Sequence, residues 1–412
     1  MAKRAFIFGA GFSIEAGFPR QGELLRLVTE EMQIGLTDLG TDPDAETKNF
    51  LHWRAKIVEF LNKVFVNRDQ PLESVFTLLD EAIGYRTTFS GYSQLQLMQL
   101  RDHWIRAILF CLHKTSEAHL SRAASPYERL AMWWALRRIL DDPTSDEVVI
   151  LSLNWDSLVE DSVFKVLKEL GGLGKVDIDY CVYTTPLNKR SWHMPSPKQG
   201  AAGRFNLKLL KMHGSSTWLR CPESGLVYTG LGTGLTATQL YLRRRKCPFL
   251  QAKAGRGATG GGLYLEPYII TPTFTKVFDL PHIQTTWHNA YVELREADEI
   301  TFVGYSLPDA DYSFRTLLLR SIRPDAQIRV ILFGDSDNPP LASSSDQFRR
   351  SLAPFRYQTL FGPSRISFDY NGARQWIQNL DARADPALRS TLEAELGKYK
   401  SIRARGPILA RP

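Results

Sequence analysis

The 412-residue chain is predicted to adopt an α/β fold: a Rossmann-like, doubly wound parallel sheet. Short apolar runs recur along the chain, and each ends at glycine or polar residues, as buried parallel strands do. Helical periodicity separates several of these runs, as the crossover connections of a parallel sheet require. The first run, at residues 5–11, ends in Gly-x-Gly, a turn that can lead a strand into a nucleotide site.

The elements are expected in a definite order. A helix should follow the first strand, from about Ser13 or Pro19 through Glu30, because its leucines and valine form one apolar face. From residue 50 to about 140, apolar residues recur at spacings of three and four. We interpret residues 45–145 as a helical insertion. Further strands are expected at 148–153, 207–212, 268–271, 299–303 and 328–333.

The composition excludes several classes of protein. Hydrophobic residues make up 43% and charged residues 23%, which is typical of a globular chain and not of a disordered one. Four widely separated cysteines argue against a disulfide framework and for a reducing compartment. No run approaches the roughly 18 apolar residues of a membrane span, and we do not expect the short apolar run near the start to act as a signal peptide. We therefore expect a cytoplasmic protein without a membrane partner.

Four short motifs follow expected strand ends, where a parallel sheet binds its ligand. The first, at residues 9–13, reads Gly-Ala-Gly-Phe-Ser. Its glycines would let the backbone approach a pyrophosphate, and the Ser13 hydroxyl could donate to a phosphate oxygen. Ile14 stands where a dinucleotide fingerprint has its third glycine, so an ordinary tight turn is an equal alternative.

The second and third motifs add polar side chains. Asn154 and Asp156 follow the strand at 148–153, and both could point at a ligand. Asp156 could instead cap the next helix, which is the commoner role for such a residue. His213 follows the strand at 207–212 and could take a proton from a ligand hydroxyl. A histidine satisfied by backbone groups is the plainer alternative.

The fourth motif, at residues 304–311, reads Gly-Tyr-Ser-Leu-Pro-Asp-Ala-Asp. Gly304 and Ser306 again place a glycine and a hydroxyl at a strand end. A strand–turn–helix junction capped by Asp309 or Asp311 is the alternative. Each motif is a weak signal alone, but all four occur in order and each follows an expected strand.

Taken in that order, the motifs resemble those of the sirtuin superfamily of NAD-consuming enzymes. They are more closely similar to the sirtuin-like (Sir2-type) NAD hydrolases of prokaryotic antiphage defence systems. The resemblance covers about residues 1–30 and 148–340. It implies an NAD-binding catalytic domain over residues 1–381, followed by a C-terminal helix and basic tail over 382–412.

The resemblance implies a role for each motif residue. His213 would be the general base at the ribose hydroxyls. Asn154 would hold the nicotinamide ribose or a water near its anomeric carbon, so these two are the candidate catalytic residues. Asp156 would face the nicotinamide carboxamide. The other candidate NAD-binding residues are Gly9, Ala10, Gly11, Ser13, Gly304, Ser306 and Asp335.

This sequence departs from the deacylating sirtuins in two places. Those enzymes hold zinc with two Cys-x-x-Cys pairs, whereas residues 221–224 read Cys-Pro-Glu-Ser and residues 247–250 read Cys-Pro-Phe-Leu. Two cysteines alone make a poor structural zinc site, unless Cys181 or a histidine completes it. We expect a degenerate, zinc-less, loop-like ribbon module at about 215–265 and no metal. Residues 19–22 also lack the Pro-Asp-Phe-Arg loop, which argues against a peptide deacylase.

The resemblance therefore implies an NAD+ glycohydrolase (NADase) that releases nicotinamide and ADP-ribose. Cleavage develops positive charge on the ribose and expels a neutral base, which requires neither a metal nor an acidic nucleophile. The family implies an NAD-depleting role in antiphage defence by abortive infection, and a homo-oligomer gated by assembly or by a partner, such as a hexameric DNA-translocating ATPase or a short Argonaute. An NAD-dependent deacylase or ADP-ribosyltransferase and a non-catalytic NAD or ADP-ribose sensor are the alternatives.

The net charge of +7 is unevenly distributed. Residues 204–256 hold ten lysines and arginines and one acid, and residues 396–412 hold five and none. The rest of the chain is therefore acidic. Solvated loop charge is one interpretation; a surface for a partner or a nucleic acid is the other. Its centre would be the basic run of Arg243, Arg244, Arg245 and Lys246.

Overall fold

The computed structural model describes residues 2–30, 45–67, 70–120, 125–140, 148–169, 176–186, 205–229, 246–250, 264–274, 280–333, 352–380 and 386–404. Seven described strands form one sheet in the order β11-β10-β9-β1-β2-β5-β3, and every neighbouring pair is parallel. These strands are β1 (Arg4–Phe8), β2 (Val148–Ser152), β3 (Val176–Asp179), β5 (Phe205–Lys211), β9 (Glu299–Val303), β10 (Gln327–Ile331) and β11 (Ile366–Asp369). The predicted doubly wound α/β fold is confirmed.

The central strands are buried on both faces. In β1, Ala5 and Ile7 face one layer of the core, and Phe6 and Phe8 face the other. Such strands read as continuous apolar runs, which is why they could be identified from the sequence. The core between the sheet and its helices is correspondingly rich in aromatic rings; Phe6, for example, packs edge-on against Trp376.

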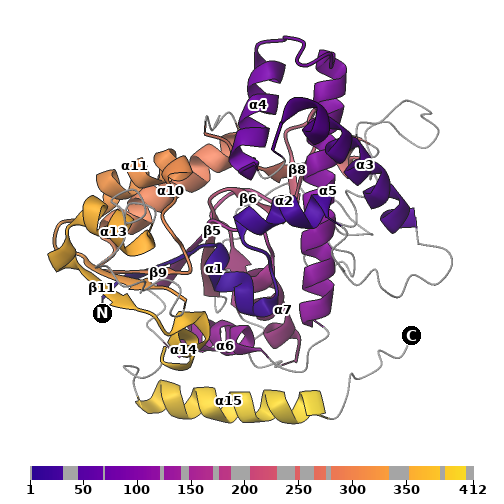
Figure 1. Ribbon diagram of the computed structural model, residues 1–412. Helices are drawn as coiled ribbons and strands as arrows, with labels where there is room; N and C mark the ends of the chain where they lie inside the picture. Colours follow the sequence, from indigo (N-terminus) through magenta and orange to yellow (C-terminus); the bar gives the residue numbers. More distant parts are fainter. Residues whose placement is uncertain are drawn as a thin grey trace, which may run out of the picture.

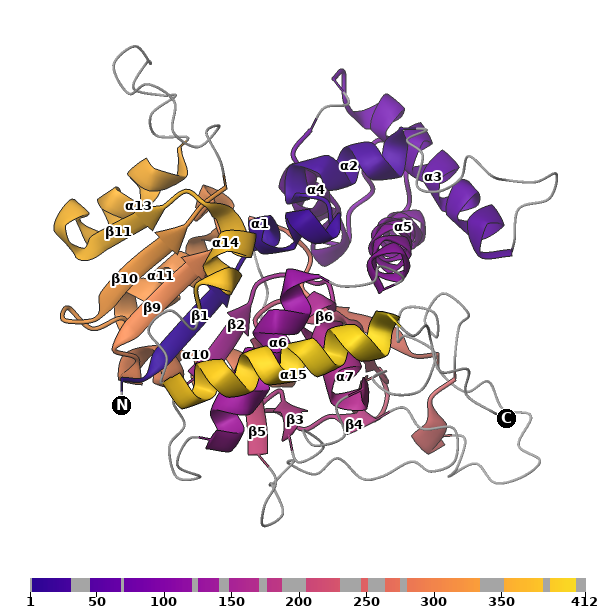
Figure 2. The same cartoon turned by 90° about the horizontal axis from the view of Figure 1, so that it is seen from below.

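Helices cover both faces of the sheet (Figures 1 and 2). On one face lie α6 (Pro126–Leu140), α7 (Leu158–Glu169) and α14 (Gly372–Gln378). Across α6 and α7 runs the C-terminal α15 (Pro386–Ala404), the yellow helix in the foreground of Figure 2. On the other face lie α10 (Pro281–Glu296), α11 (Tyr312–Ser321) and α13 (Ala353–Phe361).

A second group of helices lies apart from these layers, at the upper right of Figure 2. It contains α2 (Gln21–Thr29), α3 (Ala45–Val64), α4 (Leu72–Gly84) and α5 (Gln94–Leu120), which pack on one another. Helix α6 also lies in the range interpreted as an insertion, but it packs on β5 and α7. The short helices are α1 (Ala10–Ser13), η1 (Ile14–Ala16), η4 (Asp309–Asp311) and η6 (Pro363–Arg365). No helix of the described residues is long and apolar enough to span a bilayer.

The prediction was wrong for the region after β5. The strand expected at 268–271 is not part of the parallel sheet: β8 (Glu266–Ile269) pairs antiparallel with β6 (Gly214–Arg220). With β7 (Val227–Thr229) and β4 (Thr185–Pro186), these strands form a second sheet of four strands. The described part of the module expected to be loop-like therefore contains strands; residues 230–245 and 251–263 lie outside the description.

The two cysteines of the expected ribbon lie next to the second sheet: Cys221 directly follows β6, and Cys247 contacts Tyr228 of β7. Cys221 and Cys247 are both buried, and the backbone N–H of Ser224 donates to Cys221 Sγ at 3.4 Å. The Tyr228 hydroxyl lies 3.6 Å from Cys247 Sγ. Among the described residues, no group of three or more His, Cys, Asp or Glu side chains could hold a metal ion. Absence of zinc nevertheless stays a prediction.

Candidate active site

A cavity of about 420 Å³ lies beyond the carboxyl ends of β1, β2, β5 and β9. The candidate site residues that line it are Gly9, Ala10, Gly11, Asn154, Asp156, His213, Gly304 and Ser306. The fold thus brings together residues that are up to 297 positions apart in the sequence, because parallel strands end at the same sheet edge. Asp335 and residues 243–245 lie outside the described residues, and Lys246 pairs through its backbone with Tyr264.

The loops of the first and fourth motifs approach each other so closely that a side chain would not fit at Gly11 or Gly304. The Gly11 N–H donates to the Gly304 carbonyl at 2.7 Å, so the two strand-end loops touch. A Cβ at Gly11 would lie 2.7 Å from that carbonyl oxygen. A Cβ at Gly304, where φ is +63°, would lie 2.0 Å from the Phe12 nitrogen. Loop contact alone accounts for these two glycines, without invoking a ligand.

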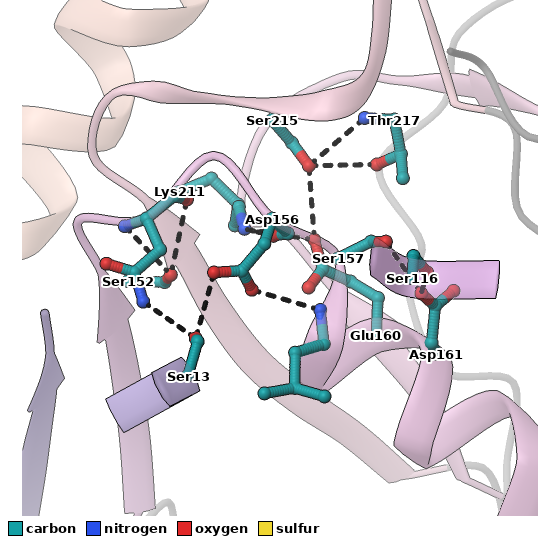
Figure 3. Close-up of polar contacts among 12 residues, drawn as sticks. Ser13, Ser116, Ser152, Asp156, Ser157, Glu160, Asp161, Lys211, Ser215 and Thr217 are labelled. Carbon is teal, nitrogen blue, oxygen red and sulfur yellow. Dashed lines mark hydrogen bonds and ion pairs between the residues drawn. The ribbon is translucent and has the colours of Figure 1, made fainter. Parts of the chain in front are cut away.

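Ser13 lies behind the cavity surface rather than on it. Its buried hydroxyl donates to Asp156 Oδ2 at 2.9 Å and accepts from Asn154 Nδ2 at 3.1 Å (Figure 3). Asn154 Nδ2 also donates to the Gly9 carbonyl at 2.9 Å. Because a carbonyl can only accept, this contact fixes the amide orientation and turns Asn154 Oδ1 away from Gly9.

Asp156 combines the two roles considered for it. Its Oδ1 accepts from the Leu158 N–H at 3.1 Å at the start of α7, as a capping residue does. Its Oδ2 accepts from Ser13, and the residue also lines the cavity. The capping interpretation and the cavity interpretation are therefore compatible in this fold.

His213 is oriented by the backbone of the neighbouring strand end. Its Nδ1 lies 3.1 Å from the Leu153 carbonyl. Because the carbonyl only accepts, Nδ1 carries the proton in the neutral ring, and Nε2 is the basic nitrogen. The ring packs near Trp287, with centroids 6.3 Å apart. His213 thus makes the backbone contact of the plainer alternative and still lines the cavity with a defined tautomer.

A buried ion pair between Lys211 and Glu160 supports the turn between Asn154 and Asp156. The sequence did not indicate this pair. Lys211 Nζ donates to the Asp156 carbonyl at 2.6 Å and lies 3.3 Å from Glu160 Oε1. Both side chains are at most 1% exposed. Burial raises the pKa of Glu160, and the nearby Lys211 charge opposes that effect. Ser215 donates to the same carboxylate at 3.3 Å (Figure 3). We call Ser13, Asn154, Asp156, Glu160, Lys211 and His213 the cavity floor.

A second part of the cavity lining, here called the cavity wall, is the loop of residues 270–273 after β8. Thr271 Oγ1 donates to Asp80 Oδ2 of α4 at 2.9 Å and accepts from Arg101 Nη2 of α5 at 3.2 Å. Asp80 and Arg101 also form an ion pair with each other. The helices after β1 thus hold the wall, and Glu73 of α4 lines the cavity directly.

Comparison with known proteins gives solved structures but no family model and no curated relative. One is a Sir2 homologue mutant with 2'-O-acetyl ADP ribose: 13% identity, 95% of this chain and 93% of that chain covered, and a TM-score of 0.40. A Sir2–p53 peptide–NAD+ complex has 10% identity, covers 92% of each chain and has a TM-score of 0.34. At such identities and TM-scores, these likenesses assign no ligand and no activity to this chain.

Proposed function

We propose that this chain is an NAD+ glycohydrolase that cleaves the nicotinamide–ribose bond to give nicotinamide and ADP-ribose. The observation that carries the proposal is the arrangement of Asn154 and His213 at one cavity, each with its orientation fixed by a backbone carbonyl. The ordered resemblance of the four motifs to the sirtuin-like NAD hydrolases supports NAD as the substrate.

The chemistry follows from those orientations. Asn154 Oδ1 would hold a water, or the ribose, at the face from which the anomeric carbon is attacked. His213 Nε2 would accept a proton from a ribose hydroxyl, which would stabilise positive charge developing on the sugar. The bond to nicotinamide breaks with its electron pair leaving on the ring nitrogen, and water adds to the ribose with release of one proton.

The residues that line the cavity after β1 favour hydrolysis over peptide deacylation. Residues 19–22, which line it, read Pro-Arg-Gln-Gly, so Gln21 and Gly22 stand where the Pro-Asp-Phe-Arg loop of the deacylases has Phe and Arg. Leu24, Glu73 and Leu112 of α2, α4 and α5 also line the cavity. Helices therefore form part of the cavity lining.

The test is the incubation of the purified full-length chain with NAD+, with and without an acetyl-lysine peptide. Nicotinamide release without peptide is expected in the wild type and should fall by about 10²–10⁴-fold in Asn154→Ala. Asp309→Asn is the matched control, because that carboxylate is exposed and does not line the cavity. Release that requires the peptide would instead support the deacylase, and no release under any condition would support the sensor.

The biological role is proposed from the resemblance of the motifs. The chain would deplete NAD during antiphage defence, as an oligomer or with a partner protein such as a DNA-translocating ATPase or a short Argonaute. Specific activity should then rise with protein concentration in the NAD+ assay. A specific activity that is constant across a wide concentration range would argue against gating by self-assembly.

A further inference from the structure

Asp311 is a buried carboxylate beside His213 that the sequence offered only as a helix cap. It stands before α11, yet its side chain makes no capping hydrogen bond. Asp311 Oδ1 instead lies 3.8 Å from His213 Nε2, and both residues line the cavity. Their side chains are 13% and 10% exposed. The carboxylate is therefore placed to act on the basic nitrogen of the imidazole.

Tyr305 fixes the direction of that carboxylate. Its hydroxyl donates to Asp311 Oδ2 at 2.9 Å, and burial raises the pKa of this phenol well above its ordinary value. The phenol therefore stays protonated and acts as a donor. Because Oδ2 is occupied in this way, Oδ1 is the oxygen that faces His213.

The distance between Asp311 and His213 suits an attraction between charges rather than a direct hydrogen bond. At 3.8 Å, the contact between Oδ1 and Nε2 is longer than a hydrogen bond. A ligand hydroxyl on the cavity side could donate to Nε2 at about 2.8 Å. A proton passed from that hydroxyl to Nε2 would create an imidazolium next to a carboxylate in a partly dehydrated site, where opposite charges attract more strongly than in water.

We propose that Asp311 is a positioning residue for His213, which it stabilises in the protonated form while the ribose carries its transient charge. This inference rests on the proposed function. The proton moves from the ribose hydroxyl to Nε2, the glycosidic electron pair leaves with nicotinamide, and Asp311 itself neither gains nor loses a proton. Charged side chains that line the same cavity among the described residues are Arg20, Glu73, Asp156 and Asp311.

The first test needs no catalysis. The chain is labelled with ¹⁵N-histidine, and the His213 resonance is identified by its loss in His213→Gln. The His213 titration midpoint should lie at lower pH in Asp311→Asn than in the wild type, because the imidazolium loses its counter-ion. Asp309→Asn, two residues away and exposed, should leave the midpoint unchanged. An unchanged midpoint in Asp311→Asn would overturn the inference.

The second test measures turnover. Asp311→Asn should lower kcat for NAD+ cleavage about tenfold or more with little change in KM, since a positioning effect is felt in the transition state. Asp311→Glu should recover part of the loss, and Tyr305→Phe should lose less than Asp311→Asn. If even the wild type fails to cleave NAD+, the proposed function fails, while the titration still decides the role of Asp311. A raised KM at unchanged kcat would contradict that role.

Discussion

The cavity floor and the cavity wall are held by different kinds of interaction. The floor is a connected network. Lys211 and Glu160 are at most 1% exposed and form an ion pair, and Lys211 donates to the Asp156 carbonyl. The wall depends on a partly exposed cluster, in which Arg101 and Asp80 are 33% and 26% exposed. Buried polar groups are costly to leave without partners, whereas partly exposed ones are solvated instead. The floor should therefore tolerate fewer substitutions than the wall.

The largest effect is expected at the floor residue closest to the chemistry. His213→Ala removes the basic nitrogen and should lower kcat/KM for NAD+ about 10²–10⁴-fold, the usual range for a lost general base. Steady-state nicotinamide release measures it. His282→Ala is the matched control, because that histidine packs on Tyr268 and does not line the cavity. Equal losses of kcat/KM in both variants would show that His213 contributes no more to turnover than a histidine outside the cavity.

The next effect concerns stability. Lys211→Met leaves Glu160 as a buried unpaired acid and should lower the free energy of unfolding by about 3–5 kcal/mol. Denaturant titration measures this loss. Adding Glu160→Gln to Lys211→Met should restore part of it, because the uncompensated acid is then removed. Lys208→Met, which breaks the half-buried ion pair with Glu293, should cost about 1 kcal/mol or less.

Sequence predicted the strands of the central sheet better than those of the second sheet for a physical reason. Strands such as β9 (Glu299–Val303) are apolar because both faces are covered. Strand β6 begins Gly-Ser-Ser-Thr, and the buried hydroxyl of Ser215 donates to Glu160, 55 positions away. A run of that composition reads as a loop until those partners are known.

The residues of the candidate site also differ in whether the sequence predicts them. Asn154 and His213 could be identified because each stands directly at the end of an apolar strand. Glu160 and Asp311 could not, since their importance lies in the contacts with Lys211 and His213, 51 and 98 positions away. Asp311 is the second carboxylate after the Gly-x-Ser of the fourth motif, which could have suggested a site residue, but helix capping explained it equally well.

A smaller effect is expected from the pH dependence of Asp161, the residue next in sequence to Glu160 of the floor. Burial raises the pKa of Asp161, beside Glu160, from 3.8 to about 6, against the opposing hydrogen bonds of Ser157 and Ser116. The folded chain therefore keeps this proton up to about pH 6, whereas the unfolded chain releases it near 3.8. The stability it contributes is complete below pH 3.8 and is lost as the pH rises through 6.

Chemical unfolding across this pH range tests that sign. Asp161→Asn should make the fall in unfolding free energy between these two values shallower than in the wild type. Asp325→Asn, at a 74% exposed carboxylate, should leave the slope unchanged. A wild-type stability that rises over the same range, with the same slope in Asp161→Asn, would show that this acid is not the source.

The smallest effect is expected at the wall. Thr271→Val keeps the shape of the side chain, removes its hydrogen bonds to Asp80 and Arg101, and leaves their ion pair in place. We expect a loss of about 1 kcal/mol in unfolding free energy and a few-fold higher KM for NAD+ at nearly unchanged kcat. Thr285→Val, on the exposed side of α10, is the control. A kcat loss as large as that of His213→Ala would show that wall and floor act as one unit.

The most direct test of the central claim is the stoichiometry of NAD+ consumption by the full-length chain in the absence of any acyl-peptide. Chromatography would follow NAD+, nicotinamide and ADP-ribose together over time. The proposed hydrolysis predicts that nicotinamide and ADP-ribose appear in equal amounts as NAD+ disappears, and that Asn154→Ala and His213→Ala suppress both products. Unchanged NAD+, or products that appear only when an acetyl-lysine peptide is added, would contradict it.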